Sequence, residues 1–532
     1  MFRIHKSAWV LVLLSAVLQI LIFPLPNLYV LCWVAVAPLV IALSRARQPD
    51  TLQLTEGVKL LSATPLQGFV MGYICGIVWY AGSCYWIFST MRQYGGVNTP
   101  AAIGILILFC LYLGLYHGAF GLLMSLLTGK GSFNPRALLL SPVVWVAVEL
   151  ARTRITGFPW DLLGIAQVDN IPLARITTFM GVYGLSLEIM IVNAAFAASF
   201  LVHREKRKTL LLAAICAAVV LQAGRLIPAP PFASDHVATL VQTNIPVVEG
   251  ADWTKEYFDT TLRDLLTFSK SPSFTPSATA ADSRLIVWPE NPAPFYTSDP
   301  AFRDALAQFA HESHAWILAG SVGIKNANQF TSRPTQIFNS AALIDPNGDL
   351  VRRYDKIHLV PFGEYVPFKN IFSFAGGLTK EVGDFSAGKS RDPLDAGGKK
   401  LGVFICYESI FPDEIRQLAA NGAQVFVNIS NDGWYGDSGA YAQHLKQARM
   451  RAMENQRWLL RDTNTGVTAS IDPYGRVVAS VPRKIRTALQ APYALSDATT
   501  FYTRRGDWLA YLCAIISVVA LLMRLPFLKK AK

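Results

Sequence analysis

The chain has 532 residues, of which 52% are hydrophobic, and it carries a formal net charge of +12. So many apolar residues, gathered in long blocks, exclude an ordinary soluble protein. Residues 228–505 contain 28 basic and 28 acidic side chains. This balance leaves no basic stripe, so we expect no nucleic-acid partner.

Eight apolar blocks resemble membrane spans in length and composition. They are Ala8–Phe23, Leu28–Leu43, Leu66–Phe88, Ala101–Leu127, Leu138–Leu150, Ile176–Val202, Leu210–Leu226 and Trp508–Leu522. No comparable block lies between Ile227 and Arg505, which predicts one inserted extramembrane domain. We therefore predict a polytopic α-helical membrane protein with a seven-span domain over residues 1–227, a folded domain over 228–505, and a last span with a basic tail over 506–532.

The basic residues outside the folded domain predict its orientation. Fifteen of these 20 Lys and Arg residues lie at the two termini or on the even-numbered connections between the predicted spans. By the positive-inside rule, both termini are cytoplasmic and the folded domain faces the outer side of the membrane.

The membrane part contains candidate lipid-binding residues. A Gly-Phe-Pro-Trp turn ending at Trp160 follows Arg152 and Arg154, and it could hold a phosphate headgroup or simply anchor a short loop at the interface. Glu149 and Glu188 lie within predicted spans, where carboxylates are costly, and Arg152 is a candidate partner for Glu149.

The folded domain alternates strand and helix patterns, which favours paired sheets with helices outside them. The predicted strands are Val237–Gln242, Arg284–Trp288, Ala315–Gly320, Ile337–Ile344, Leu350–Tyr354, Gly402–Ile405, Gln424–Ile429, Trp458–Asp462, Val467–Ile471 and Val477–Val481. The predicted helices are Thr254–Ser269, Ala301–Glu312, Pro412–Ala420 and Tyr441–Gln456. Phe362–Leu394 has no periodicity, and we predict that it forms a lid. No metal-spaced Cys/His cluster or phosphate-binding Gly loop occurs in the sequence, so we expect no metal and no cofactor.

Three predicted strands are followed by residues suited to acyl transfer. Glu290, Lys356 and Cys406 could act together, because a carboxylate can take the thiol proton and an ammonium can stabilise both a thiolate and an oxyanion. Cys406 is the only one of the seven cysteines outside the apolar blocks. A cysteine at the end of a core strand can also be merely buried.

These motifs resemble those of the nitrilase superfamily. The stretches Trp288-Pro289-Glu290, Tyr354–Pro367 and Cys406–Ser409 carry the likeness, which implies an α-β-β-α sandwich with a Glu-Lys-Cys triad. Four further stretches make nearly the whole chain similar to the bacterial apolipoprotein N-acyltransferase family: Thr156–Trp160, Leu240–Pro246, Asn428–Trp434 and Glu454–Arg457.

This second resemblance implies a ping-pong transfer of an acyl chain in the bacterial inner membrane, with the folded domain periplasmic. The donor would be the sn-1 ester of a phospholipid, and the acceptor would be the α-amine of the S-diacylglyceryl cysteine of an apolipoprotein, which completes lipoprotein maturation. Cys406 would be the nucleophile, Glu290 the general base and acid, and Lys356 the oxyanion stabiliser. The family pattern also implies supporting roles for Glu364, Tyr407 and Glu408, and a substrate-binding role for Trp253, alongside the candidates Arg152 and Trp160.

Two alternatives remain open from the residues alone. The first is a membrane-anchored amidase of the nitrilase type that acts on a small C–N substrate. Such an enzyme would need only one span as an anchor, and the sequence predicts eight. The second is a transporter or receptor with a nitrilase-like binding domain, in which Cys406 would be dispensable.

Overall fold

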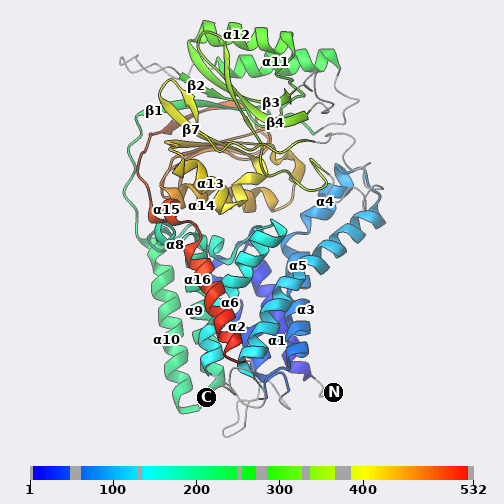
Figure 1. Ribbon diagram of the computed structural model, residues 1–532, viewed down its shortest axis with the longest axis vertical. Helices are drawn as coiled ribbons and strands as arrows, with labels where there is room; N and C mark the ends of the chain where they lie inside the picture. The colour runs from blue at the N-terminus through cyan, green and yellow to red at the C-terminus, as the bar shows by residue number, and fades with distance from the viewer. Residues whose placement is uncertain are drawn as a thin grey trace. The chain divides into compact units, whose positions relative to one another are not determined.

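The computed structural model describes residues 4–47, 61–129, 135–202, 204–247, 254–270, 284–325, 336–365 and 385–524. The chain forms two compact units (Figure 1). The first comprises Met1–Phe88, Thr99–Ala229 and Arg505–Lys532, and the second comprises Ser89–Asn98 and Pro230–Arg504. The short segment Ser89–Asn98 therefore packs with the second unit, although it connects two helices of the first.

The first unit is helical. Its main helices are α1 (Lys6–Leu21), α2 (Ala37–Arg45), α3 (Pro65–Ser83), α4 (Trp86–Gln93, which runs into the second unit), α5 (Thr99–Thr128), α6 (Pro135–Ala151), α9 (Val182–Leu201), α10 (Arg204–Ala223) and α16 (Trp508–Leu522). Short helical turns join them: η1 (Tyr29–Trp33), η2 (Arg152–Thr156), η3 (Leu163–Gln167), α7 (Ile171–Ala174), α8 (Thr177–Met180) and η4 (Gly224–Leu226).

Glycines allow α3 and α5 to pack closely. Gly68, Gly72 and Gly76 recur every fourth residue on α3, and a Cβ atom added at Gly72 would lie 2.1 Å from the carbonyl oxygen of His117 on α5. Small residues permit this approach of two backbones, and van der Waals contact then holds the helices together in a lipid environment.

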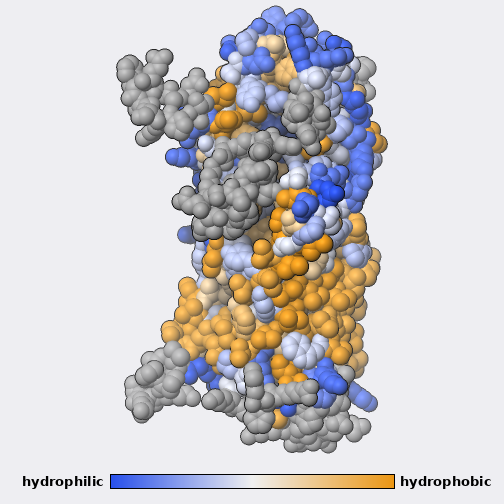
Figure 2. All heavy atoms as spheres, turned by 90° about the vertical axis from the view of Figure 1, so that its right-hand side faces the viewer, coloured by the Kyte–Doolittle hydropathy of each residue, from blue (hydrophilic) through white to orange (hydrophobic). Residues whose placement is uncertain are grey.

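In the described part of the chain, three helices are long and apolar enough to cross a membrane: α5, α9 and the stretch Lys206–Leu226. The pair α3 and α4, bent by 53°, would make a fourth, whereas α1, Tyr29–Arg45 and α16 are shorter apolar helices. On the face shown in Figure 2, hydrophobic side chains form a broad band over the helices of the first unit.

Three of the predicted blocks are not continuous helices. Leu28–Leu43 divides into η1 and α2, because Pro38 in the first turn of α2 cannot continue a preceding helix. Leu66–Phe88 breaks between Ser83 and Trp86, and Ile176–Val202 breaks at Gly181, which has a φ of 64°.

The second unit contains two six-stranded sheets. The first has the order β12-β1-β2-β3-β4-β5 and the second has the order β11-β10-β9-β8-β7-β6. The strands of the first sheet are β1 (His236–Gln242), β2 (Arg284–Val287), β3 (Ala315–Lys325), β4 (Gln336–Ile344), β5 (Leu350–Asp355) and β12 (Thr487–Tyr493). Those of the second are β6 (Leu394–Ala396), β7 (Lys399–Ile405), β8 (Val425–Ser430), β9 (Leu459–Thr463), β10 (Thr468–Ile471) and β11 (Val477–Val481).

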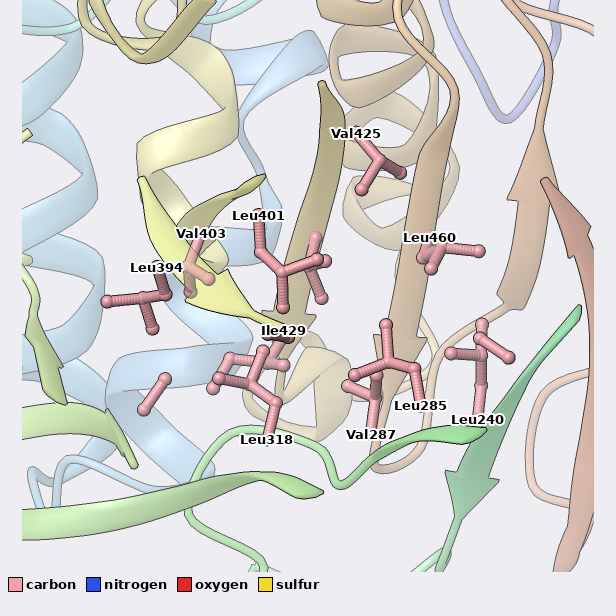
Figure 3. Packing of buried hydrophobic residues seen from close by; sticks show 14 of the residues in the cluster. Leu240, Leu285, Val287, Leu318, Leu394, Leu401, Val403, Val425, Ile429 and Leu460 are labelled. Carbon is pink, nitrogen blue, oxygen red and sulfur yellow. The ribbon is translucent and has the colours of Figure 1, made fainter. Parts of the chain in front are cut away.

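The two sheets lie between two pairs of helices. Side chains such as Leu240 and Leu318 from the first sheet meet Val403 and Ile429 from the second in the central core (Figure 3). The helices α11 (Lys255–Ser269) and α12 (Pro300–Ser313) cover the outer face of the first sheet, whereas α13 (Pro412–Ala420) and α14 (Ala440–Asn455) cover the second (Figure 1). The short helix α15 (Phe501–Arg505) ends the unit. The predicted α-β-β-α sandwich is confirmed.

All ten predicted strands and all four predicted helices are present, with small differences at their ends. The prediction missed β6, which has only three residues and enters a Gly397-Gly398 turn with positive φ at both positions. It also missed β12, whose Pro492 is unusual in a strand but is tolerated because β12 pairs only with β1 at the sheet edge.

Candidate active site

Parallel pairing brings the ends of the catalytic-type strands to one place. The strands β1, β2 and β3 run parallel, as do β7, β8 and β9, so residues that follow their carboxyl ends gather at one edge of each sheet. Glu290 comes three residues after β2, and Cys406 comes directly after β7. Lys356 comes directly after β5, which pairs antiparallel with β4.

The predicted residues Glu290, Lys356 and Glu364 form one buried cluster. The Nζ atom of Lys356 lies 3.2 Å from Oε1 of Glu290 and 2.9 Å from Oε1 of Glu364. Burial alone would lower the pKa of Lys356, but the charges of the two carboxylates raise it above its ordinary value. The side chain of Lys356 therefore remains an ammonium, and the three groups together carry a formal charge of −1.

Asn339 completes this cluster, and the sequence analysis did not predict it. Its Nδ2 atom donates to Oε1 of Glu290 at 2.8 Å and to Oε1 of Glu364 at 2.7 Å, while its backbone oxygen accepts from the amide of Lys356. Asn339 lies inside β4, where no motif marks it. The one available signal was that Asn339 is a polar residue within a mostly apolar strand, where a buried side chain needs hydrogen-bond partners.

The second oxygen of each carboxylate is also held. Oε2 of Glu290 accepts from the amide of Asn431, which follows β8, and Oε2 of Glu364 accepts from the amide of Val360. Every oxygen of the two carboxylates thus has a donor at 2.7–3.2 Å, which fixes their rotamers before any substrate binds.

Cys406 lies at a strained turn between β7 and the short helical turn η7 (Cys406–Ile410). Its φ is +49°, a left-handed conformation that is uncommon for residues other than glycine and often marks a functional site. Burial raises the pKa of the Cys406 thiol well above its usual range; Glu290 raises it further, and Lys356 opposes both effects. The expected ammonium effect is present but does not prevail, so the resting side chain is a thiol whose proton must leave during attack.

Glu408 links the Cys406 turn to the Lys356 strand. Its carboxylate accepts from the amides of Ile405, Ile357 and His358 and from the hydroxyl of Tyr354. Burial raises the pKa of Glu408 to about 7, although these amide donors lower it. Tyr407, beside it, is buried, and its ring packs edge-on against Phe411.

The candidate lipid-binding residues of the first unit are buried rather than displayed. Nη1 of Arg152 donates to the hydroxyl of Tyr80, and Trp160 packs against the Trp86 ring. Arg152 and Glu149 do not form an ion pair among the contacts of the described residues; Oε1 of Glu149 accepts instead from the amide of Leu163. The two charges nonetheless act on each other, so the predicted partnership is an electrostatic attraction without a direct contact.

Two other predictions fall wholly or largely outside the described residues. Trp253 is not among the described residues, and neither is most of the Phe362–Leu394 segment. Glu188 lies on α9, half-buried, and its Oε2 atom has no hydrogen-bond partner among the described residues. The binding roles of Trp253, Arg152 and Trp160 remain predictions.

Comparisons with known proteins agree with this arrangement. A family model described as carbon-nitrogen hydrolase matches residues 237–502, and one described as apolipoprotein N-acyltransferase N-terminal domain matches residues 15–195. Among solved structures, the carbon-nitrogen hydrolase of Helicobacter pylori aligns with 52% of this chain and 92% of its own, at 17% identity and a TM-score of 0.34. The family model shows that residues 237–502 of the second unit form a carbon-nitrogen hydrolase domain.

Relatives of nearly full length narrow the assignment. The apolipoprotein N-acyltransferase of Geobacter metallireducens is 32% identical over 99% of this chain and 97% of its own length. That of Methylococcus capsulatus is 34% identical over 85% of this chain and 87% of its own. The chain belongs to the apolipoprotein N-acyltransferase family.

Proposed function

We propose that the chain transfers the sn-1 acyl chain of a phospholipid, through a thioester on Cys406, to the α-amine of the S-diacylglyceryl cysteine of an apolipoprotein. As a member of its family it is an N-acyltransferase of lipoproteins. The observation that carries the mechanism is the hydrogen-bonded cluster of Lys356, Glu290 and Glu364 at the strand ends, with Glu290 and Lys356 both acting on the Cys406 thiol.

In the first half-reaction, Glu290 takes the thiol proton while Sγ of Cys406 attacks the sn-1 carbonyl carbon. Accepting this proton brings the formal charge of the cluster from −1 to zero, which favours Glu290 as the base. The carbonyl oxygen becomes an oxyanion, and Lys356 stabilises it. When the C–O bond breaks, Glu290 returns the proton to the departing lysophospholipid oxygen, and the thioester remains.

In the second half-reaction, the acceptor amine attacks the thioester carbon. Glu290 takes a proton from this amine, the C–N bond forms, and the C–S bond breaks. The proton then returns to sulfur and regenerates the thiol. Cys406 is only 6% exposed, and this enclosure would keep water from hydrolysing the thioester before the amine arrives.

The remaining residues support these steps. Glu364 and Glu408 orient the cluster and the Cys406 turn through the contacts described above, and the amide of Tyr407 would be a further oxyanion donor. We assign phospholipid or lipoprotein binding to Trp253, Arg152 and Trp160 on their positions in the sequence.

We also propose the setting in the cell. Residues 1–227 would form the seven-span domain, residues 228–505 the periplasmic catalytic domain, and residues 506–532 the last span with its basic tail, giving about eight spans. Both termini would be cytoplasmic in the bacterial inner membrane, as the distribution of Lys and Arg indicates. This orientation would place the thiol on the outer side, where diacylglyceryl-modified lipoproteins would be met.

A membrane-anchored amidase is the competing function. The nitrilase-type domain permits it, but the family match over residues 15–195 gives the helical unit a role beyond that of an anchor. The two functions differ in the intermediate, because only the acyltransferase would carry a long acyl chain on sulfur.

Intact-mass spectrometry of the purified full-length protein tests the proposal. After incubation with a phospholipid whose sn-1 and sn-2 chains differ in mass, the protein should gain the mass of the sn-1 chain, and neutral hydroxylamine should remove it. Addition of a diacylglyceryl peptide should transfer the chain to the peptide amine.

Matched variants assign the steps. Cys406→Ala should gain no mass, and Glu290→Gln should gain it at least about 100-fold more slowly, the usual contribution of a general base. A wild-type protein that never gains an acyl chain, or a Cys406 labelled only from the cytoplasmic side of sealed vesicles, would end the proposal.

A further inference from the structure

A buried polar cluster lies against the backbone of Cys406. His444 on α14, Asp432 after β8 and Arg461 on β9 are each at most 1% exposed. Nδ1 of His444 lies 2.9 Å from Oδ1 of Asp432, and Nε2 lies 3.0 Å from the backbone oxygen of Cys406. Nη2 of Arg461 donates to Oδ2 of Asp432 at 2.8 Å, and its Nη1 donates to the side chain of Asn428.

The partners of His444 orient its ring. Nε2 faces a backbone carbonyl oxygen, which can only accept, so Nε2 donates its N–H to Cys406. Nδ1 lies within hydrogen-bond distance of Oδ1 of Asp432, at 2.9 Å, and of Nη2 of Arg461, at 3.1 Å. The Asp432–Arg461 pair therefore holds one side of the ring while the other side faces Cys406.

Asp432 anchors the cluster. Burial would raise its pKa, but the charge of Arg461 and the contacts with His444 and Ser430 hold the pKa of Asp432 below its ordinary range. Asp432 therefore remains a carboxylate, and it pairs with Arg461 at 2.8 Å.

The contact with Cys406 falls at the strained position. A left-handed non-glycine residue persists only where its surroundings determine it, and the Cys406 carbonyl is oriented by the His444 ring. On the other side of the peptide, the amide of Ile405 donates to Glu408. The turn is thus held from both ends, by a carboxylate on its amide side and by an imidazole N–H on its carbonyl side.

We propose that His444, oriented by Asp432 and Arg461, is a positioning residue that fixes Cys406 in its left-handed turn by donating to its backbone oxygen. This inference rests on the proposed function, because it concerns Cys406 as the nucleophile. The charged and titratable groups around the ring are Asp432, Arg461, Tyr435, whose ring packs edge-on at 5.6 Å, and Cys406; Lys356 and Glu290 act on the thiol from the other sheet.

Two substitutions test the hydrogen bond to Cys406. His444→Gln keeps an N–H donor within reach of the Cys406 carbonyl, whereas His444→Leu removes the donor. Met450→Ala is the matched control, because it removes a fully buried apolar side chain from the same helix and should cost stability alone.

Two readouts distinguish positioning from folding. The rate of Cys406 alkylation by iodoacetamide, followed as a function of pH by peptide mass spectrometry, reports the thiolate independently of acyl transfer. Single-turnover thioester formation from phospholipid reports the attack. The thermal unfolding midpoint of each detergent-solubilised variant shows how much of a lost rate comes from lower stability.

His444→Leu should slow thioester formation by about 5- to 100-fold, because a buried carbonyl loses its donor and the turn is released. His444→Gln should recover part of this loss. His444→Leu should also shift the alkylation profile, because a released turn moves the thiol relative to Glu290 and Lys356, whose charges act on it, whereas His444→Gln should stay closer to the wild-type profile. Met450→Ala should lower the unfolding midpoint and leave the alkylation profile in place.

A wild-type alkylation profile in His444→Leu would overturn the inference, as would losses of rate that merely follow the unfolding midpoint in all three variants. If His444→Leu does not fold, His444→Asn, whose amide is too short to reach the Cys406 carbonyl, takes its place. If the wild type never forms a thioester, the proposed function fails, and the alkylation profiles still decide the role of His444.

Discussion

Asn339 gives a sharp test of the active-site geometry, because it donates to both carboxylates with one nitrogen. Asn339→Leu keeps the shape of the side chain and removes the two hydrogen bonds, at 2.8 Å to Glu290 and 2.7 Å to Glu364. The two carboxylates would then share only Lys356 as a side-chain donor, and their repulsion would be less well compensated.

The magnitude follows from the strength of these bonds. Hydrogen bonds to charged groups contribute roughly 1.5–3 kcal/mol each, so two contribute about 3–6 kcal/mol. If this free energy is lost from the transition state, thioester formation should slow by about 10²- to 10⁴-fold. Asn291 provides the control, because its Nδ2 atom donates at 3.0 Å to Oδ1 of Asn339 and touches neither carboxylate in the described contacts.

The assay is single-turnover thioester formation on phospholipid, at a temperature where each variant is folded by circular dichroism. Asn291→Gly should be about 2- to 10-fold slower than wild type, which corresponds to one neutral hydrogen bond. Glycine also suits the positive φ of 34° at this position. A rate for folded Asn339→Leu within tenfold of wild type would show that the cluster does not depend on this amide, and the reasoning would fail.

The remaining predictions concern packing and pH. Gly72→Val should lower the unfolding midpoint of the first unit steeply, because its Cβ would meet the His117 carbonyl at 2.1 Å, whereas Gly104→Ala on the same helix pair has open space around it and should be tolerated; equal effects would refute the packing argument. The pKa of Asp432 is held low in the folded state, so its contribution to stability is present above about pH 4 and is lost as the pH falls further. Asp432→Asn should therefore weaken the fall in the free energy of unfolding below about pH 4, measured by denaturant unfolding at each pH. A fall equal to that of wild type would contradict this. The pKa of Glu408 is raised to about 7, so its protonated form favours the fold, and up to about 3 kcal/mol should be lost as the pH rises from about 4.5 to 7. Glu408→Gln should remove this slope, measured by denaturant unfolding at each pH, and a slope equal to that of wild type would count against the assignment.

Much of the site could be predicted from the chain because its chemistry follows the ends of strands. Glu290, Lys356 and Cys406 each come shortly after a run of residues suited to a strand, and that local pattern survives in the fold. Glu364 and Glu408 belong to the same motifs, and both contact the cluster or its turn.

Other members of the site depend on register rather than on local pattern. Asn339 reaches Glu290 because β4 pairs with β3 so that Asn339 faces Val322, and pairing with β5 brings it beside Lys356. His444 lies inside a helix among several buried polar residues, and only the packing of α14 on the second sheet turns its ring towards Cys406.

The sequence by itself determined the class of the protein, because apolar blocks, charge bias and strand-end motifs are local properties that each segment carries wherever it packs. It also predicted which groups would do the chemistry. The tertiary structure alone decided how those groups are held: which amide satisfies each carboxylate, which side chain supports the Cys406 carbonyl, and where Arg152 and Glu149 find their partners. These contacts join residues far apart in the chain, and they depend on a register and a packing that no single segment encodes.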